Sequence, residues 1–249
     1  MAVCGFQRRL MVKKHYWYIL LTYVIMLFSG YFGYPLLLQL GVDRSQVIGY
    51  WNIISFAIGV IVVLLLLRKD RGDYDLRGKP ASPASSAAWA IGGIFLAFLA
   101  QVIAANIESQ LLGIKPGSEN TKQIMDIVKV TPLMIFVVSI AGPVLEEIVF
   151  RKIIFGTIYK RTNFILAALI SSVIFAVVHR DPAHILLYSA MGFTFAFLYV
   201  KTKRIIVPII AHLSMNTIVV VIQYVYSDDI ERMMKDAEQL QSIIGGNFL

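Results

Sequence analysis

Seven long apolar stretches divide the chain and restrict it to folds that a lipid bilayer can hold. About 20 apolar residues in a helix cross the ~30 Å hydrocarbon core, and most of the stretches approach or exceed that length. Only 15% of the residues are charged and the mean hydropathy is +0.72, unlike a soluble chain of this size. We therefore predict an all-α, polytopic membrane helix bundle of about seven spans. The stretches lie at about 17–40, 49–67, 87–107, 131–159, 163–179, 183–200 and 204–226.

The distribution of lysine and arginine indicates an orientation. With a cytoplasmic N-terminus, 16 of the 23 basic residues fall on the cytoplasmic side, as the positive-inside rule requires. Basic residues in short loops lie beside anionic lipid, so the net charge of +8 does not call for a nucleic-acid partner. The first stretch is too long for a signal peptide, and we expect it to be retained. A single cysteine, Cys4, excludes an intrachain disulfide. We predict a multi-pass protein of the cell membrane with its N-terminus in the cytoplasm.

Polar segments divide the chain into three parts. A polar loop at 68–86 follows the first two predicted spans. Residues 1–86 therefore form an N-terminal part of two spans and a cytoplasmic basic loop. Residues 87–226 hold the remaining spans and form the predicted core. In the tail, residues 227–249, apolar side chains recur at helical spacing, which predicts an interfacial amphipathic helix.

A shorter helix is predicted between the third and fourth spans, after the KPGS turn at 115–118. Apolar Ile124, Ile127 and Val128 alternate there with charged residues. This pattern indicates an amphipathic helix lying at the membrane interface. We expect this helix and the tail to pack and anchor the protein.

The fourth span contains ionisable side chains that require an explanation. A charge near the bilayer centre costs at least ~2.5–3.5 kcal/mol on insertion scales, so such groups tend to be paired and functional. Glu147 and Arg151 are i, i+4 neighbours that can form an ion pair. Glu146 is rotated by ~100° and lacks that partner. The spacing therefore predicts a structural role for the pair and leaves Glu146 free to act.

Two further polar residues pair with a neighbour on the same helix face. Phe175 and His179 lie at i, i+4 in the fifth span, and His212 and Asn216 do so in the seventh. Along straight helices rising 1.5 Å per residue, the polar groups of the three spans spread over ~12 Å of depth. His179 fits worst, but helix tilt and side-chain reach can close that gap.

The fourth span is expected to tilt or bend, because it is longer than the bilayer requires. Gly142 and Pro143 provide a place for the bend. Pro143 has no N–H to bond the carbonyl of Ser139. The resulting kink, one turn before Glu146, would open a polar pocket.

These side chains are the components of a general-base hydrolase. A carboxylate and an imidazole can activate water, and a second imidazole with an amide can donate hydrogen bonds to a developing oxyanion. Peptide hydrolysis inside the membrane is therefore the sharpest hypothesis. No HExxH motif, no GxSxG motif and no aspartate within a span is found, which disfavours the corresponding protease classes. Two histidines and a glutamate could bind zinc. A metal-dependent reaction therefore remains the alternative to glutamate-dependent hydrolysis without a cofactor, which we favour.

The motifs EEIVFR, FAVVH and HLSMN, in this order on separate predicted helices, resemble the three motifs of the CAAX-protease and bacteriocin-processing (Abi) family. That family includes the eukaryotic Ras-converting CAAX endopeptidases. The motifs cover residues 146–216, and the resemblance extends over about 87–226.

The resemblance implies an all-helical intramembrane endopeptidase. Glu146 and His179 would activate water, and His212 and Asn216 would form the oxyanion hole. The supporting residues would be Glu147, Arg151 and Phe175. The substrate would be a membrane-anchored peptide or protein. Eukaryotic members cut after a prenylated cysteine and bacterial members process varied peptides, so the substrate stays open, as does the oligomeric state.

Two hypotheses of other classes compete with hydrolysis. A non-catalytic membrane scaffold, such as an immunity or signalling regulator, would keep its function without Glu146. A proton-coupled transporter would show repeated halves and a continuous polar path, and neither is visible. A single buried histidine or asparagine is usually hydrogen-bonded helix glue, and we expect His184, which belongs to no motif, to be structural or interfacial. Three motifs together favour a site.

Overall fold

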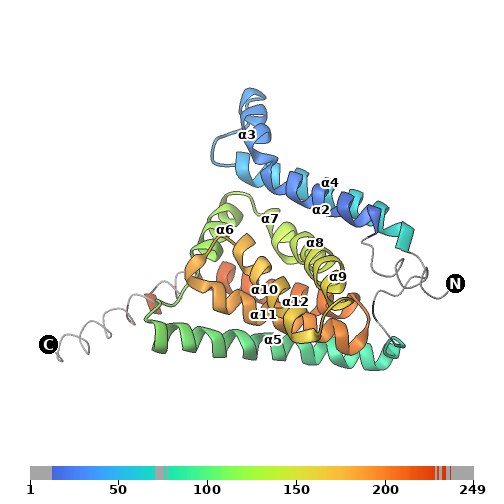
Figure 1. Ribbon diagram of the computed structural model, residues 1–249. Helices are drawn as coiled ribbons and strands as arrows, with labels where there is room; N and C mark the ends of the chain where they lie inside the picture. Colours follow the sequence, from blue (N-terminus) through green and yellow to red (C-terminus); the bar gives the residue numbers. More distant parts are fainter. Residues whose placement is uncertain are drawn as a thin grey trace.

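The computed structural model describes residues 13–70, 76, 78–227, 229, 232–233 and 236. In these parts of the chain every regular element is a helix, and no strand is found. The prediction of an all-α bundle of apolar helices is confirmed (Figure 1). Most of the predicted amphipathic helix of the tail, residues 227–249, lies outside the described residues.

The first predicted span is divided into two helices. α2 (Lys14–Phe28) and α3 (Gly30–Gln39) meet at an angle of 47°. Between them, the Ser29 hydroxyl donates a hydrogen bond to the carbonyl of Met26 at 2.8 Å and accepts one from Trp51 Nε1 at 2.9 Å. A serine that bonds back to the preceding turn favours a bend. The sequence pattern predicted a single span here, because both halves are apolar.

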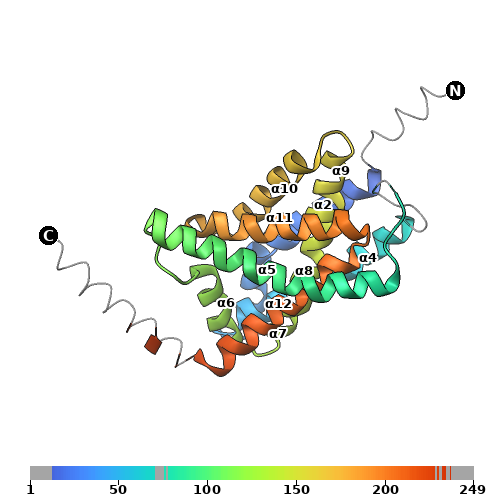
Figure 2. The ribbon, with the colours of Figure 1, turned by 90° about the horizontal axis from the view of Figure 1, so that it is seen from below.

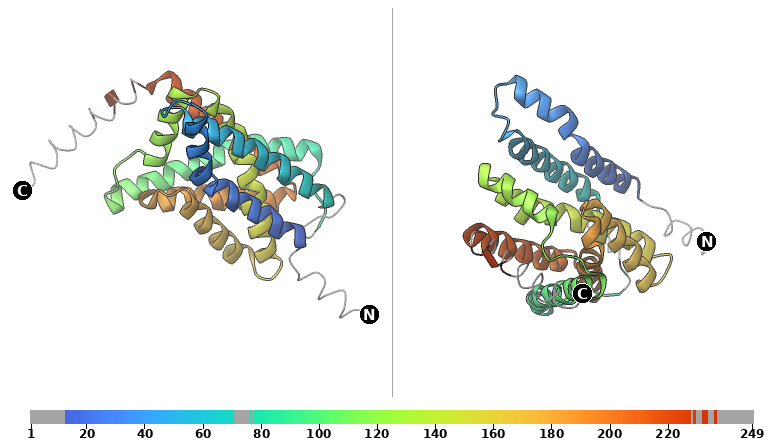
Figure 3. Two further views of the ribbon diagram at one scale, coloured as in Figure 1. Left: turned by 90° about the horizontal axis from the view of Figure 1, so that it is seen from above. Right: turned by 90° about the vertical axis from the view of Figure 1, so that its left-hand side faces the viewer.

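The next helices form two opposite faces of the molecule. α4 (Val47–Leu67) packs beside α2 and is followed by the short 3₁₀ helix η1 (Arg68–Asp70). α5 (Pro83–Leu112) lies on the far side of the bundle from this pair (Figures 1 and 3). The Ser82 hydroxyl caps the start of α5 by accepting from the Ser85 amide, as N-cap residues do. The helix continues past 107, where we predicted its end.

The predicted short amphipathic helix is present as α6 (Glu119–Val130). The Ser118 side chain caps its N-terminus by accepting from the amide of Thr121 at 3.1 Å. Met125 and Val128 are buried, and the charged residues of α6 lie on its outer face. Its predicted place at a membrane interface stays a prediction.

A helical run with irregular hydrogen bonding carries the first motif. It alternates between α and π geometry, and its segments are α7 (Met134–Phe136), η2 (Val137–Ala141), α8 (Gly142–Glu146), η3 (Glu147–Phe155) and α9 (Gly156–Tyr159). In η2 and η3 the backbone bonds span five residues; the amide of Gly142, for example, donates to the carbonyl of Val137. Such π segments often occur at functional sites. The irregular hydrogen bonding lies beside Gly142 and Pro143, where we predicted a kink; the kink itself stays a prediction.

The last three helices close the bundle. They are α10 (Phe164–Val178), α11 (Ile185–Thr202), which is preceded by the 3₁₀ turn η4 (Pro182–His184), and α12 (Ile206–Val225). Seen from below, α5 crosses over α11 and α12 (Figure 2). α10 and α11 approach closely because Gly192 lies against Ser172; a Cβ at position 192 would be 2.9 Å from that side chain. Small residues allow such close helix packing.

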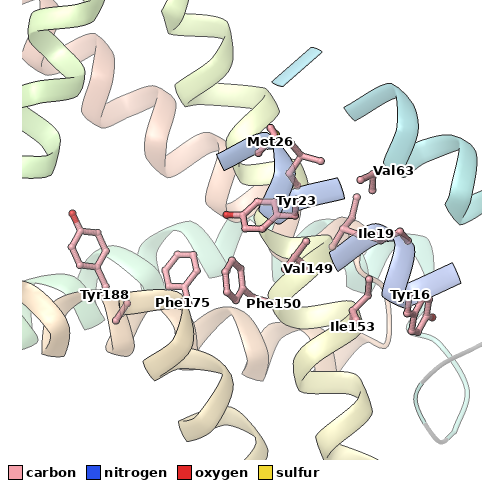
Figure 4. Packing of buried hydrophobic residues seen from close by; sticks show 13 residues of the cluster. Tyr16, Ile19, Tyr23, Met26, Val63, Val149, Phe150, Ile153, Phe175 and Tyr188 are labelled. Carbon is pink, nitrogen blue, oxygen red and sulfur yellow. The ribbon is translucent and has the colours of Figure 1, made fainter. Parts of the chain in front are cut away.

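The N-terminal helices pack directly on the helix that carries the first motif. One buried cluster joins α2 and α4 to η3, α10 and α11 (Figure 4). Its labelled members are Tyr16, Ile19, Tyr23, Met26, Val63, Val149, Phe150, Ile153, Phe175 and Tyr188. The two predicted N-terminal spans are therefore part of the packing around the motif helices.

Four described helices are long and apolar enough to cross a membrane, or five if α2 and α3 form one bent span. The four are Val47–Asp70, Pro83–Leu112, Pro182–Thr202 and Ile206–Val225. α10 is apolar but has only 15 residues. The run from α7 to α9 does not count because it is broken into short segments. All seven predicted stretches are helical, but the count of seven spans is not established.

Candidate active site

One cavity of about 640 Å³ brings the three motifs together. Glu146, His179, His212 and Asn216 all line it. The 12 Å spread in depth expected from straight helices thus does not prevent these four side chains from reaching one cavity. His179, the worst fit in depth, reaches the cavity from the C-terminal end of α10.

His212 contacts a buried ion pair formed by Glu147 and Arg151. His212 Nδ1 lies 2.9 Å from Glu147 Oε1, and the second oxygen of Glu147 lies 3.2 Å from Arg151 Nε. The predicted ion pair of Glu147 and Arg151 is present. Glu147 also reaches another helix, which the sequence did not indicate, and so links the first motif to the third.

Aromatic rings surround the Arg151 guanidinium. Both Arg151 and Glu147 are 0% exposed, and none of the three guanidinium nitrogens makes a hydrogen bond to the described residues. The 3.2 Å contact with Glu147 is thus an ion pair without hydrogen-bond geometry. The guanidinium carbon lies 4.4 Å from the ring centre of Phe175, 5.6 Å from Phe195 and 5.9 Å from Phe150. Cation–π attraction in this dry setting compensates part of the desolvation. Phe175, which we predicted as a supporting residue, thus contacts the buried guanidinium with its ring.

The orientation of His179 is held on three sides. Its Nδ1 lies 2.8 Å from the carbonyl of Phe175, and because a carbonyl only accepts, Nδ1 carries the hydrogen. Nε2 of the neutral ring is then the acceptor. The ring packs against Phe175 at 4.4 Å and stacks on Tyr188 at 4.3 Å between centres. The hydroxyl of Tyr188 in turn lies 3.0 Å from Ser118 Oγ.

Asn216 replaces a missing backbone hydrogen bond. Its Nδ2 donates to the carbonyl of Val138 at 3.2 Å. In the π pattern of η2 this carbonyl would accept from residue 143, but Pro143 has no N–H. The third motif is therefore tied to the proline that precedes the first. One hydrogen of the Asn216 amide is used here, and the other is available to the cavity.

Glu146 is the most accessible member of the first motif. Its side chain is 19% exposed, against 0% for that of Glu147. Glu146 Oε2 lies 3.7 Å from His212 Nε2, which is an electrostatic contact but too long for a hydrogen bond. Glu146 thus faces the cavity with an imidazole beside it.

A second carboxylate–imidazole pair lines the same cavity. His184 Nδ1 lies 2.7 Å from Glu108 Oε2, and His184 Nε2 lies 3.0 Å from the carbonyl of Gly117. The other oxygen of Glu108 accepts from the amide of Leu187 at 2.9 Å. These bonds tie α5 to the start of α11 and to the loop before α6. These contacts are in line with a structural place for His184, which we expected to be structural or interfacial. Sequence reasoning missed Glu108, since it placed the end of the third span one residue earlier.

No group of three or more His, Cys, Asp and Glu side chains among the described residues is arranged to hold a metal ion. One oxygen of Glu147 faces His212 Nδ1 and the other faces Arg151. A zinc-dependent reaction stays a prediction of the sequence.

Several residues near the motifs carry no sequence signal of their own. Phe195 stacks on His212 at 4.6 Å, Tyr188 stacks on His179, and Tyr23 of α2 lines the cavity. Aromatic residues are common throughout these apolar helices, so no spacing rule distinguishes them. Only their contacts do.

Comparison with known proteins agrees with this geometry. The sequence model described as "Type II CAAX prenyl endopeptidase Rce1-like" matches residues 129–218, which include all three motifs. The chain is 49% identical over 247 residues to the "Putative membrane peptidase YdiL" of Bacillus subtilis, covering 96% of this chain and 100% of the relative. This chain belongs to the Rce1-like CAAX protease family. It is also 31% identical over 240 residues to the "Membrane-embedded CAAX protease MroQ" of Staphylococcus aureus, covering 91% of this chain and 97% of that one. No solved structure matches.

Membership agrees with the resemblance of the motifs and makes the chain a membrane protease of the CAAX type. The family match begins at residue 129, whereas the cavity also takes residues from α2, α4, α5 and α6. A large share of the cavity wall therefore lies outside the matched region.

Proposed function

We propose that the chain is an intramembrane endopeptidase that hydrolyses a peptide bond of a membrane-associated peptide or protein, with water activated by Glu146 and His179. The observation that carries the proposal is the convergence of Glu146, His179, His212 and Asn216 on one cavity. A carboxylate, two imidazoles and an amide are sufficient for water attack on a carbonyl.

Each side chain has a defined task in the proposed reaction. Glu146 accepts a proton from the attacking water and then donates it to the leaving amine. Nε2 of His179 accepts the second hydrogen of the water and so orients its oxygen, because Nδ1 is occupied by the carbonyl of Phe175. The developing oxyanion receives hydrogen bonds from the free hydrogen of the Asn216 amide and from Nε2 of a doubly protonated His212. Glu147 Oε1 lies 2.9 Å from His212 Nδ1 and so fixes the orientation of the ring.

The cavity is suited to a largely apolar peptide. Its walls carry apolar side chains such as Leu27, Phe56 and Val219 next to the polar groups, and about 640 Å³ accommodates several residues of an extended chain. We propose a CAAX-like or other bacterial peptide that is held at the membrane by lipid or by an apolar segment. We also propose that the N-terminus is cytoplasmic, because this orientation places 16 of 23 basic residues on that side.

The test uses the purified protein in liposomes with a panel of prenylated and membrane-anchored peptides. Glu146→Gln keeps the size of the side chain but cannot accept a proton, so we expect cleavage to be lost while the thermal unfolding midpoint is retained. Asp126→Asn on the exposed face of α6 is the matched control and should cleave like the wild type. Wild-type turnover in Glu146→Gln contradicts the proposal.

Two further arms separate the alternatives. Cleavage that stops on addition of a zinc chelator and returns with zinc would show a metal-dependent reaction. If no peptide is cleaved, genetic complementation by Glu146→Gln would identify a scaffold, because a scaffold does not need the carboxylate.

A further inference from the structure

Tyr23 enters the candidate active site from a helix that the family match does not include. It belongs to α2 and is 6% exposed, and it lines the same cavity as Glu146 and His179. Its ring stands edge-on to Phe150 of η3, with 5.8 Å between centres and 89° between planes. In Figure 4 the Tyr23 oxygen points toward the side of the cluster on which Phe175 and Tyr188 lie.

The Tyr23 hydroxyl makes no hydrogen bond within the described part of the chain. A buried tyrosine usually finds a partner for its hydroxyl. Other tyrosines here follow that rule. Tyr16 donates to Asp70 at 2.8 Å, and Tyr188 bonds Ser118. The Tyr23 oxygen is not among the fully buried atoms that lack a partner, so it is accessible, and the side chain lines the cavity. The hydroxyl of Tyr23 is therefore a donor without a partner among the described residues, on a side chain that lines the same cavity as Glu146.

The reaction proposed above can use such a donor, because both oxyanion donors assigned to it also have other contacts. One hydrogen of the Asn216 amide is occupied by the carbonyl of Val138. The His212 ring lies between two carboxylates, at 2.9 Å from Glu147 and 3.7 Å from Glu146. Both groups that the family resemblance assigns to the oxyanion are thus partly engaged. A neutral phenol can donate without the desolvation that a second cation would require.

We propose that Tyr23 is a further catalytic residue whose O–H donates a hydrogen bond to the oxygen of the scissile carbonyl as that oxygen becomes an anion. The inference rests on the proposed endopeptidase function and extends its oxyanion hole to α2. No proton is transferred by Tyr23, since the hydrogen bond forms in the tetrahedral intermediate and is released when the carbonyl reforms. The water proton still passes through Glu146 to the leaving amine.

The deciding variant is Tyr23→Phe, which removes one oxygen and keeps the ring against Phe150. Loss of one oxyanion donor lowers kcat by about 10²–10³-fold in a well-studied protease. With other donors present here, we expect about 10–100-fold, with KM little changed because the bond strengthens only in the transition state. Tyr16→Phe, seven residues earlier in the same helix and outside the cavity, is the matched control and should keep the wild-type kcat.

A second measurement does not depend on turnover. A fluorescent peptidyl difluoroketone, which hydrates to a tetrahedral diol, is compared in binding with the parent peptide amide. The wild type should prefer the ketone, and Tyr23→Phe should lose about 10-fold of that preference while binding the amide unchanged. A packing role would affect both ligands alike and would lower the unfolding midpoint.

The outcomes distinguish the two proposals. If Glu146→Gln is inactive but Tyr23→Phe has the wild-type kcat and ketone preference, the role of Tyr23 is wrong and the proposed function stands. If Glu146→Gln cleaves like the wild type, the proposed function fails and the role of Tyr23 fails with it.

Discussion

Replacing Arg151 with methionine tests whether the buried cation stabilises the site. Arg151 and Glu147 are fully buried, their charges lie 3.2 Å apart, and the guanidinium carbon is 4.4 Å from the Phe175 ring. Removing one partner of a buried ion pair costs ~3–5 kcal/mol, because the other charge stays buried. Since His212 still bonds Glu147 and methionine retains most of the packing, we take the lower end, ~3 kcal/mol. At ~2–4 °C per kcal/mol for a chain of this size, the unfolding midpoint should fall by about 6–12 °C.

The assay is intrinsic tryptophan fluorescence of the purified protein in detergent during heating. Removing both charges at once should be less harmful than removing one, because no unpaired charge is left. The double variant Glu147→Gln with Arg151→Met should therefore regain at least half of the lost midpoint, since the glutamine oxygen can still accept from His212. A midpoint of Arg151→Met within 2 °C of the wild type, or a double variant less stable than either single one, would refute this account of the buried pair.

Two further predictions address packing and topology. Gly192→Val places a side chain against Ser172, where a Cβ would be 2.9 Å away, and such overpacking should lower the free energy of unfolding by ~1–3 kcal/mol. The same thermal assay measures this loss. In the control Gly92→Ala the added Cβ points into open space, so we expect no fall in the unfolding midpoint. The proposed cytoplasmic N-terminus predicts that a membrane-impermeant maleimide labels Cys4, the single cysteine, in inside-out vesicles but not in intact cells; labelling in intact cells would reverse the orientation.

The sequence was sufficient to predict features that depend on neighbours within one helix. Apolar length indicated the helices, and i, i+4 spacing indicated the ion pair of Glu147 and Arg151, which the structure contains. The missing N–H of Pro143 indicated where the helical hydrogen bonding of the fourth predicted span would be disturbed, although not its π geometry. Each of these features depends on the spacing of residues along one helix, which can be read directly from the sequence.

Contacts between helices could not be predicted, because they depend on how each helix is rotated and displaced. The bond from Glu147 to His212 joins residues 65 positions apart. It also depends on η3, where π geometry changes the direction of successive side chains. Glu108 was missed because it lies just past an apolar run, and Tyr23 because an aromatic residue in an apolar helix is unremarkable until its surroundings are known.

The residues that line the cavity come from two parts of the sequence. The three motifs lie within residues 129–218, which the family match covers, whereas Leu27, Asn52 and Phe56 of α2 and α4 face the same cavity from outside that region. Selection for a new peptide sequence can therefore act on Leu27, Asn52 and Phe56 and leave the three motifs unchanged. Relatives that share the three motifs need not share a substrate, and the N-terminal helices are where the difference between them should be sought.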